Sequence, residues 1–273
     1  MSSSHYSKLD NLYTKSEIDT LIENSSSSGN YGPDVNRYEE IYLGDHVTEE
    51  QSRNIANGTF NGLPIGAYWT INNINYRIMS QDHYYFVTPH PILGNISYNG
   101  IDTHHVVVMP DTIYSKYKYK GTDNNDTNDR GYYSSDLKPY IQNTYNPMIT
   151  NAFGANHILV HTHDLTSGTY NNGTLISTSA TKAWLINSYN IDGEKYDYET
   201  SYKWQTSDKT QFPAFKYNTT LKIANYNGSA DYWWLGSSSR YNSYCFCVMY
   251  SSGVFGYIRS ALAHGVRPAF LVY

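Results

Sequence analysis

The sequence predicts an α+β fold in which two helices accompany a mainly antiparallel sheet with long loops. Most apolar runs are short, rich in β-branched or aromatic residues, and separated by Gly or Asn turns, which is typical of strands. Two longer stretches carry helix-start signals and apolar residues at helical spacing. Because no second flexible linker follows residue 38, we expect residues 38–273 to form one domain.

Residues 1–23 are predicted to form a short helix that oligomerises or attaches the chain. Thr14 stands three residues before Glu17, which is capping-box spacing, and an apolar stripe of Ile18, Leu21 and Ile22 follows. A helix this short needs a partner in water, so a parallel coiled coil between copies is one interpretation and an unstructured tail is the other. Residues 24–37 begin with NSSSSGNYGP and read as a flexible Ser/Gly linker.

The two domain helices are expected at residues 48–56 and 134–153. The first has a capping box of Thr48 with Gln51 and Gly58 behind it as a terminator. The second is Ser-capped, and its prolines are expected to bound or kink it; they are Pro139 and Pro147.

The predicted strands include a tight hairpin between YWTI and YRIM, whose turn is Asn72-Asn73 or a neighbouring pair. The polar stretch at 122–131 is expected to be an exposed loop. Further strands are expected in the runs YYFVTP, HHVVVMP, HILVHT and TKAWLIN.

The amino-acid composition disfavours some classes of function and favours others. Tyrosine supplies 30 of 273 residues, whereas Lys and Arg total 19 and the formal net charge is −5. A nucleic-acid partner needs clustered cations, so none is expected. No apolar run is long enough for a membrane span, so membrane insertion is not expected. Tyr, Ser, Asn and Gly are typical of recognition surfaces.

The C-terminal stretch, residues 231–273, is the most informative. Bulky anchors at 232–235 and 265–270 bracket a segment, residues 237–264, that mixes sizes and polarities without strand alternation. Exposed Tyr and Arg bury large area at low entropic cost. We therefore predict a ligand-binding surface there, made of Arg240, Tyr241, Tyr244, Cys245, Cys247, Tyr250, Ser252, Tyr257, Ile258, Arg259, Leu262 and His264.

This bracket resembles the terminal module of C-type-lectin-fold proteins in phages and gut bacteria, in which WWL-type and GVRPA-type ends enclose a variable stretch. The upstream sequence is similar to the same phage-associated domain, so that the resemblance covers roughly residues 41–273. The segments that carry it are IANGTFNGLPIGAYWTINNINYRI and DLKPYIQNTYNPMITNAFGANHIL. LYTKSEIDTLI resembles a segment of phage tail fibres and baseplate proteins that precedes a trimeric stem or head.

The resemblance extends to retroelement-diversified variable proteins of the major tropism determinant type. In those proteins the variable residues arise by mutagenesis at adenines of a template. Such mutagenesis cannot turn an Asn codon into a codon for Lys, Glu, Gln or Trp, and none of these residues occurs between Gly236 and Gly265. Met cannot arise in this way either, so Met249 must come from another codon or a fixed position. A short Tyr/Ser-rich strand segment would also lack these residues, so this alternative stays open.

The resemblance implies a phage tail-tip or fibre adhesin, a homotrimer that contacts other tail proteins and binds a host-cell surface protein or glycan. Its expected location is the virion, after assembly in the bacterial cytoplasm. The alternative is a bacterial surface or secreted ligand-binding protein with the same fold.

A third reading, a formylglycine-generating oxidative enzyme, is disfavoured because Cys245 and Cys247 lack an adjacent base in the sequence. The two cysteines lie on one strand, where no disulfide is expected. His104-His105 and the pair His161 and His163 are read as ordinary turn or strand histidines. No enzyme activity, cofactor or metal, calcium included, is predicted.

Overall fold

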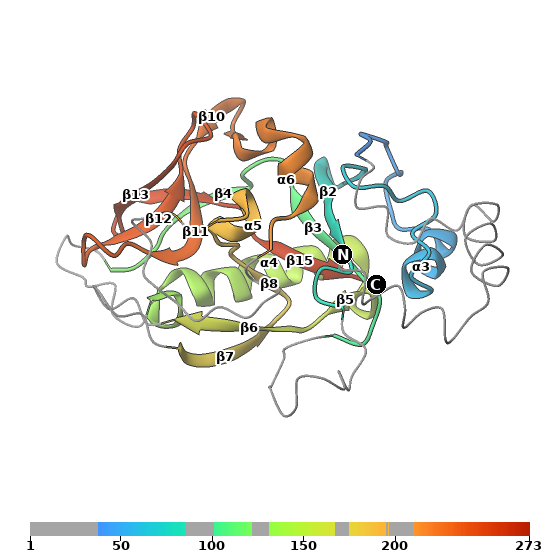
Figure 1. Cartoon of the computed structure of the whole chain (residues 1–273), viewed down its shortest axis with the longest axis horizontal. Coiled ribbons are helices and arrows are strands. Elements are labelled where there is room, and N and C mark those ends of the chain that lie inside the picture. Colours follow the sequence, from blue (N-terminus) through green and yellow to red (C-terminus); the bar gives the residue numbers. More distant parts are fainter. Residues whose placement is uncertain (1–37, 86–100, 122–130, 167–174, 195, 197–209) are drawn as a thin grey trace, which may run out of the picture.

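The fold is a mixed α+β arrangement, as predicted. The computed structural model describes residues 38–85, 101–121, 131–166, 175–194, 196 and 210–273. The predicted N-terminal helix (1–23), the linker (24–37), most of the 122–131 loop and most of the YYFVTP run lie outside these residues. Along the longest axis, helix α3 (Glu49–Ala56) stands toward one end, and strands β12 (Cys245–Met249) and β13 (Phe255–Arg259) stand toward the other (Figure 1).

The first sheet has six strands in the order β1-β2-β3-β15-β5, and β8 also pairs with β15. All its pairings are antiparallel. The last strand of the chain is therefore central, because it hydrogen-bonds to three others. The strands are β1 (Tyr68–Ile71), β2 (Ile74–Gln81), β3 (Val106–Pro110), β5 (Ile158–Leu159), β8 (Ala183–Trp184) and β15 (Ala269–Val272).

The predicted hairpin is confirmed, and of the turn positions considered the structure uses Asn72-Asn73. Tyr68 pairs with Arg77 and Ile71 with Ile74, so only Asn72 and Asn73 form the turn. Both have positive φ, 52° and 63°. A type I′ turn needs this left-handed backbone at both positions, and Asn is among the residues that adopt it most readily.

The second sheet has five strands in the order β13-β12-β11-β14-β4. Its pairings are antiparallel except for β11 with β14. Four of its strands come from the C-terminal stretch, while β4 comes from far upstream. The strands are β4 (Ser115–Lys118), β11 (Trp233–Ser238), β12 (Cys245–Met249), β13 (Phe255–Arg259) and β14 (Ala263–Val266). Two hairpins stand apart: β6 (His161–Thr166) with β7 (Leu175–Thr181), and β9 (Ala224–Tyr226) with β10 (Ser229–Asp231).

The two substantial helices are α3 and α4 (Leu137–Phe153). The capping box of Thr48 with Gln51 is formed in α3, as predicted. Helix α4 begins three residues later than expected because Gly131–Ser134 forms the 3-10 helix η1. Ser135 Oγ nevertheless accepts a hydrogen bond from the Lys138 N–H at 3.1 Å. The shorter helices are α5 (Ser188–Asp192), α6 (Pro213–Tyr217), η2 (Ala155–His157) and η4 (Thr219–Lys222).

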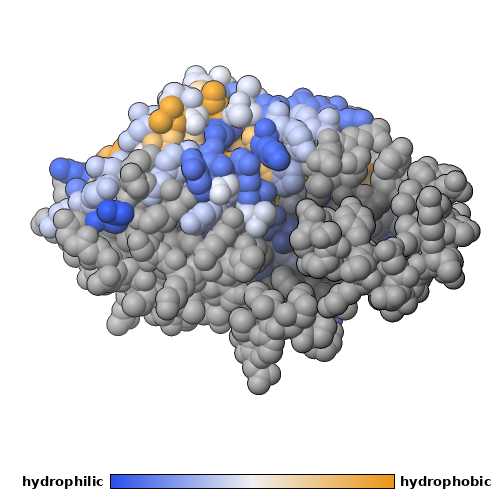
Figure 2. Space-filling model, in the orientation of Figure 1, coloured by the Kyte–Doolittle hydropathy of each residue, from blue (hydrophilic) through white to orange (hydrophobic). Residues whose placement is uncertain are grey.

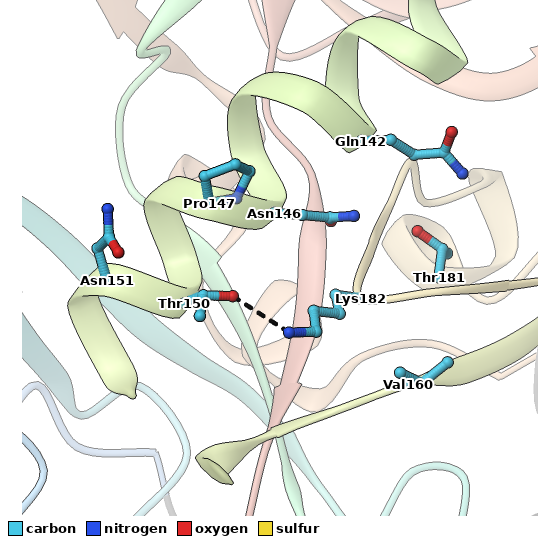
Figure 3. Close-up of a pocket in the computed structure, with 8 residues that line it drawn as sticks. All are labelled: Gln142, Asn146, Pro147, Thr150, Asn151, Val160, Thr181 and Lys182. Atoms are coloured by element: carbon cyan, nitrogen blue, oxygen red, sulfur yellow. Dashed lines mark hydrogen bonds between the residues drawn. The ribbon is translucent and has the colours of Figure 1, made fainter. Parts of the chain in front are cut away.

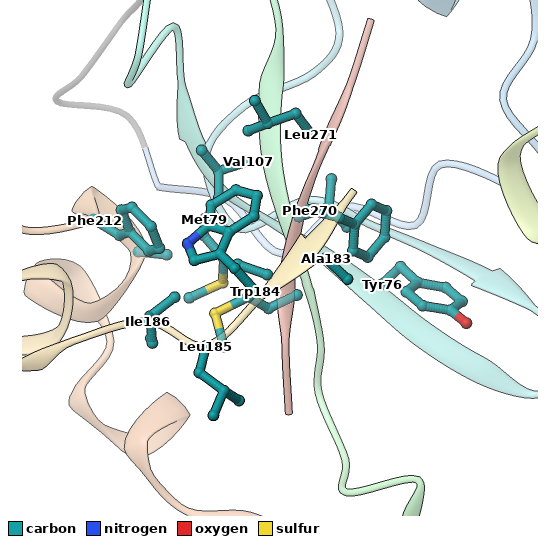
Figure 4. Packing of buried hydrophobic residues seen from close by; sticks show 14 of the residues in the cluster. Tyr76, Met79, Val107, Ala183, Trp184, Leu185, Ile186, Phe212, Phe270 and Leu271 are labelled. Carbon is teal, nitrogen blue, oxygen red and sulfur yellow. The ribbon is translucent and has the colours of Figure 1, made fainter. Parts of the chain in front are cut away.

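The core between α4 and the first sheet is rich in aromatic residues. The ring of Tyr76 meets Phe153 of α4 edge-on at 5.1 Å and Phe270 of β15 at 5.8 Å. Figure 4 shows Trp184 packed among Met79, Phe212 and neighbouring aliphatic side chains. The buried face of α4 consists of Leu137, Ile141, Tyr145, Ile149 and Phe153, at four-residue spacing throughout. No helix of the described residues is long and apolar enough to span a membrane.

Buried arginines tie the segments together. Arg77 of β2 makes two 2.7 Å hydrogen bonds to the carboxylate of Asp111 and donates to the Gly66 carbonyl at 2.6 Å. Arg267, in the loop between β14 and β15, donates to the carbonyls of Pro110 and Leu221 at 2.6 Å each. Full burial lowers the pKa of Arg267 to about 10, so its charge is costly and depends on these bonds.

Candidate functional site

The anchors that bracket the C-terminal segment form a rigid frame. Trp233 and Trp234 are fully buried, and their indole N–H groups donate to the carbonyls of Lys222 at 3.0 Å and Tyr117 at 2.8 Å. A Cβ on Gly265 would lie 2.5 Å from Ile113 and 2.8 Å from the Tyr232 carbonyl oxygen, so only glycine fits there. The frame holds β11 and β14 together.

The twelve predicted site residues differ in accessibility. Four of their large side chains are well exposed: Tyr241 at 50%, Leu262 at 47%, Tyr244 and Tyr257 at 38% each. Ser252 and Arg259 are also exposed. The half-buried members are Arg240, Tyr250, Ile258 and His264, and the buried members are Cys245 and Cys247.

The prediction that the two cysteines belong to the binding surface is wrong. Cys245 is 4% exposed and Cys247 is 0% exposed. They lie on β12, which has β11 and β13 on its two sides and is buried on both faces. This double burial explains why residues 245–249 show no alternation of polar and apolar side chains, since every residue of β12 is internal. The two cysteines are not joined by a disulfide, and burial raises the pKa of the Cys245 thiol.

Several of the accessible members lie at opposite ends of β12 and β13, whereas Tyr257 and Ile258 lie within β13 and His264 lies on β14. At one end, the 239–244 loop and the 259–262 turn carry Arg240, Tyr241, Tyr244, Arg259 and Leu262. The Ser260 N–H donates to the Tyr244 carbonyl at 3.0 Å, which joins the loop to the turn. We call this group the loop cluster. A five-residue strand spans about 17 Å, so the 250–254 turn with Ser252 lies that far away.

The 250–254 turn carries an apolar patch that sequence reasoning missed. Val254 is 59% exposed, and Ile223, 40% exposed, lies 3.2 Å from the position of a Cβ on Gly253. Figure 2 shows hydrophobic residues at the top of the molecule, in the region where Figure 1 labels β10. Val254 was overlooked because it sits among small polar turn residues.

Five aromatic rings form a row across one face of the second sheet. Tyr250 lies 4.9 Å from Tyr232, which lies 5.4 Å from His264. His264 is opposite Tyr117 in the β14–β4 register, and Tyr117 stacks on Tyr140 of α4 at 3.9 Å. We call these five residues the aromatic row, and all are half-buried. Tyr117 and Tyr140 were missed because they lie far upstream of the C-terminal segment.

A pocket opens where the aromatic row reaches α4. It has a volume of about 460 Å³ and is lined by Tyr117, Lys118, Asp136, Pro139, Tyr140 and Asn143. Lys118 Nζ lies 3.3 Å from a carboxylate oxygen of Asp136, which also accepts the Gly121 N–H at 2.9 Å. Aromatic rings beside a few polar groups are typical of small-molecule sites. We call this the tyrosine pocket.

A second, larger pocket of about 580 Å³ lies between α4 and the residues Val160, Thr181 and Lys182 (Figure 3). Its polar groups hold the fold together. Lys182 Nζ donates to Thr150 Oγ1 at 3.3 Å, and the Ala183 N–H donates to Asn146 Oδ1 at 3.2 Å. These hydrogen bonds attach the start of β8 to α4, so the polar residues that line this pocket already have a structural role.

The histidines singled out in the sequence have structural surroundings. His104 Nδ1 lies 2.7 Å from Asp82 Oδ2, and its ring stacks on Tyr85 at 4.1 Å. His161 is buried between Tyr84 and Trp184, at 4.2 and 5.0 Å between ring centroids. No cluster of three or more His, Cys, Asp or Glu suited to a metal occurs among the described residues, which exclude the His163 side chain.

Comparison with known proteins assigns a family without a function. A family model described as a domain of unknown function, DUF6273, matches residues 103–273. The chain belongs to this family. No curated protein and no solved structure matches it. The DUF6273 match includes the loop cluster, the aromatic row and the tyrosine pocket, but β1 and β2, which complete the first sheet, lie before it.

Proposed function

We propose that this DUF6273 protein is a phage tail-tip or fibre adhesin that binds a receptor on the host-cell surface through its C-terminal sheet. The observation that carries the proposal is a contrast in burial between the anchor residues and the side chains on the loops beside them. The anchors Trp233, Trp234 and Phe270 are fully buried, whereas Tyr241, Tyr244 and Leu262 are large and exposed. Large exposed side chains on a rigid support give binding area at low entropic cost.

The contact surface in this proposal is the loop cluster together with Tyr257. Arg240 lies 4.8 Å above the ring of Tyr241, so the guanidinium and the ring are presented together. Tyr and Arg are enriched among residues that dominate binding energy at protein interfaces. None of these side chains is needed inside the core, so they can vary while the frame persists.

The finer fold proposed is a C-type-lectin-like domain. The support is the resemblance of the WWL-type and GVRPA-type ends, together with a mainly antiparallel C-terminal sheet that contains those anchors. Residues 1–23 would join three copies and attach them to other tail proteins. Three copies on one particle would convert weak single contacts into strong attachment through avidity.

The test exchanges only exposed residues. In one variant, the exposed residues Tyr241, Tyr244, Tyr257, Arg259 and Leu262 are replaced together by residues of different size and polarity. Binding of the labelled full-length chain to a panel of bacterial strains is measured beside its melting temperature. We expect a changed set of bound strains with a small change in melting temperature, because surface substitutions usually cost less than about 0.5 kcal/mol each.

A matched control replaces two exposed tyrosines elsewhere, Tyr42 and Tyr114, which are 57% and 52% exposed. This control should bind the same strains as the unaltered chain. The proposal fails if the exposed-residue variant keeps the original strain set while the control alters it. Loss of folding in the exposed-residue variant would also count against it, since these side chains would then be part of the core.

A further inference from the structure

We infer that the tyrosine pocket binds one neutral pyranose residue of a glycan. The inference deepens the proposed adhesin function and rests on it for the source of the glycan, a host-cell surface. It concerns a site on the opposite edge of the second sheet from β13, built by β4 and α4.

Flat aromatic surface is the first requirement for a sugar, and the pocket supplies it. Tyr117 and Tyr140 both line the pocket and are stacked, with ring centroids 3.9 Å apart and an interplanar angle of 5°. Their facing sides cover each other, so a sugar stacks on an outer face of the pair. The carbon–hydrogen face of a pyranose is apolar and slightly positive, so it is attracted to the negative face of an aromatic ring.

The rings are held in place before any ligand arrives. The Tyr140 hydroxyl donates to Ser115 Oγ at 2.9 Å, and Ser115 Oγ is 3.0 Å from the Tyr145 hydroxyl. Tyr145 in turn donates to the Val266 carbonyl at 2.8 Å. This chain of hydrogen bonds joins α4 to β4 and β14, so binding pays little to order the stacked pair.

The polar lining matches sugar hydroxyls, which both donate and accept. The Asp136 carboxylate accepts, the Lys118 ammonium donates, and the Asn143 amide does both. Asn143 is exposed, so its amide can reach an incoming ligand. A volume of about 460 Å³ lies within the ordinary range for ligand pockets.

The charges that line the pocket favour a neutral sugar over an anionic one. Lys118 and Asp136 are the two charged residues that line the pocket, and they lie 3.3 Å apart. The ammonium is therefore already balanced by a carboxylate. An acidic sugar or a phosphate would place a second negative charge beside Asp136, which is unfavourable.

The experiment titrates the full-length chain with neutral methyl pyranosides of glucose, galactose, mannose and N-acetylglucosamine. Saturation-transfer NMR detects binding, and chemical shifts give the affinity. At least one pyranoside should bind with Kd on the order of 1 mM, as expected for so small a ligand. Asp136→Asn and Asn143→Ala should each weaken it at least fivefold, and Tyr140→Ala at least tenfold.

Two further variants separate recognition from folding. Tyr140→Phe keeps the ring and should retain binding within about threefold, whereas Tyr42→Ala, distant from the pocket, should leave it unchanged. If Tyr140→Ala does not fold, the exposed Asn143→Ala variant still tests the site. Binding that is indifferent to both Asp136→Asn and Asn143→Ala overturns the inference, as does binding of sialic acid or inorganic phosphate but of no neutral pyranoside.

Strain binding measured in parallel distinguishes this inference from the adhesin proposal. If bacterial cells are bound and no pyranoside is, the glycan site is wrong and the adhesin proposal stands. If a pyranoside binds at this pocket and no cell is bound, the site is correct and the adhesin proposal is wrong.

Discussion

The guanidinium of Arg267 lies over the indole of Trp233, 5.2 Å from the ring centroid. Trp233 belongs to the second sheet, whereas the Pro110 carbonyl that accepts from Arg267 Nε belongs to the first. One buried side chain therefore joins the two sheets at the point where β14 leads into β15. This junction fixes the frame on which the proposed contact residues stand.

Arg267→Lys should lower the free energy of unfolding by roughly 2–4 kcal/mol. Lysine has one nitrogen where Arg267 uses two, so a buried carbonyl of Pro110 or Leu221 loses its donor. Urea unfolding followed by tryptophan fluorescence measures the change. Arg240→Lys, at a half-buried position in the loop cluster, is the control and should cost less than about 1 kcal/mol. Equal losses in the two variants would contradict the proposed role of Arg267.

Stability should fall as the pH drops below about 6.5, in part because of His105. This side chain is fully buried, with Nδ1 2.8 Å from the Thr103 carbonyl oxygen and Nε2 accepting the Tyr84 N–H at 3.3 Å. Burial lowers its pKa from the ordinary value of 6.5. Below pH 6.5 the imidazole is therefore protonated more readily in the unfolded chain than in the folded chain. The free energy of unfolding falls by up to about 1.4 kcal/mol for each unit by which the pH is lowered.

The test compares His105→Asn with the unaltered chain by urea unfolding between neutral and mildly acidic pH. The variant is expected to be less stable at neutral pH, but its stability should decline less steeply on acidification. His264, whose pKa burial also lowers, remains in both proteins and contributes equally to both slopes. Identical slopes would show that His105 does not titrate differently on folding.

Gly256→Ala should displace the ring of Tyr250 from the aromatic row. A Cβ at this position would lie 2.2 Å from Tyr250 Cζ, which is far inside a normal contact. The expected loss is about 1 kcal/mol, at the low end for an overpacked contact, because the half-buried ring of Tyr250 can turn aside. In a double-mutant cycle, the same substitution in a Tyr250→Ala background should cost much less. Additive losses would mean that the two residues do not interact.

The two cysteines should resist thiol reagents in the native protein. Cys245 and Cys247 are buried, and burial raises the pKa of Cys245, so little thiolate is available. A colorimetric disulfide reagent should label both after unfolding in guanidinium and neither at a fast rate before it. The exposed position Ser252 gives the control, since Ser252→Cys should add one fast-reacting thiol. Fast native labelling of the original cysteines would place them on the surface after all.

Local sequence signals predicted local structure well. Thr48 and Gln51 form their capping box, and Asn72-Asn73 forms the two-residue turn, because both features depend on residues within a few positions of each other. The start of α4 was misplaced by three residues because Gly131–Ser134 took a 3-10 turn instead. The N-terminal coiled coil and the receptor remain predictions.

Long-range pairing explains what sequence reasoning missed. Both faces of β12, which lies inside the sheet between β11 and β13, are covered, and nothing local to Cys247 signals this burial. Tyr117 and Tyr140 join the aromatic row only because β4 pairs with β14 and α4 packs beside it. The burial of a strand and the composition of a site depend on partners that are distant in the chain.

By itself, the sequence determined the α+β class, the hairpin, the two helices and the anchors at each end of the C-terminal segment. These follow from capping, turn conformation and apolar patterning, which act over a few residues. The tertiary structure decided which side chains reach solvent, because burial depends on every element packed around a strand. In the folded chain the two cysteines are buried. Tyr117 and Tyr140 meet at the edge of the sheet, where they line a pocket with Asp136 and Asn143.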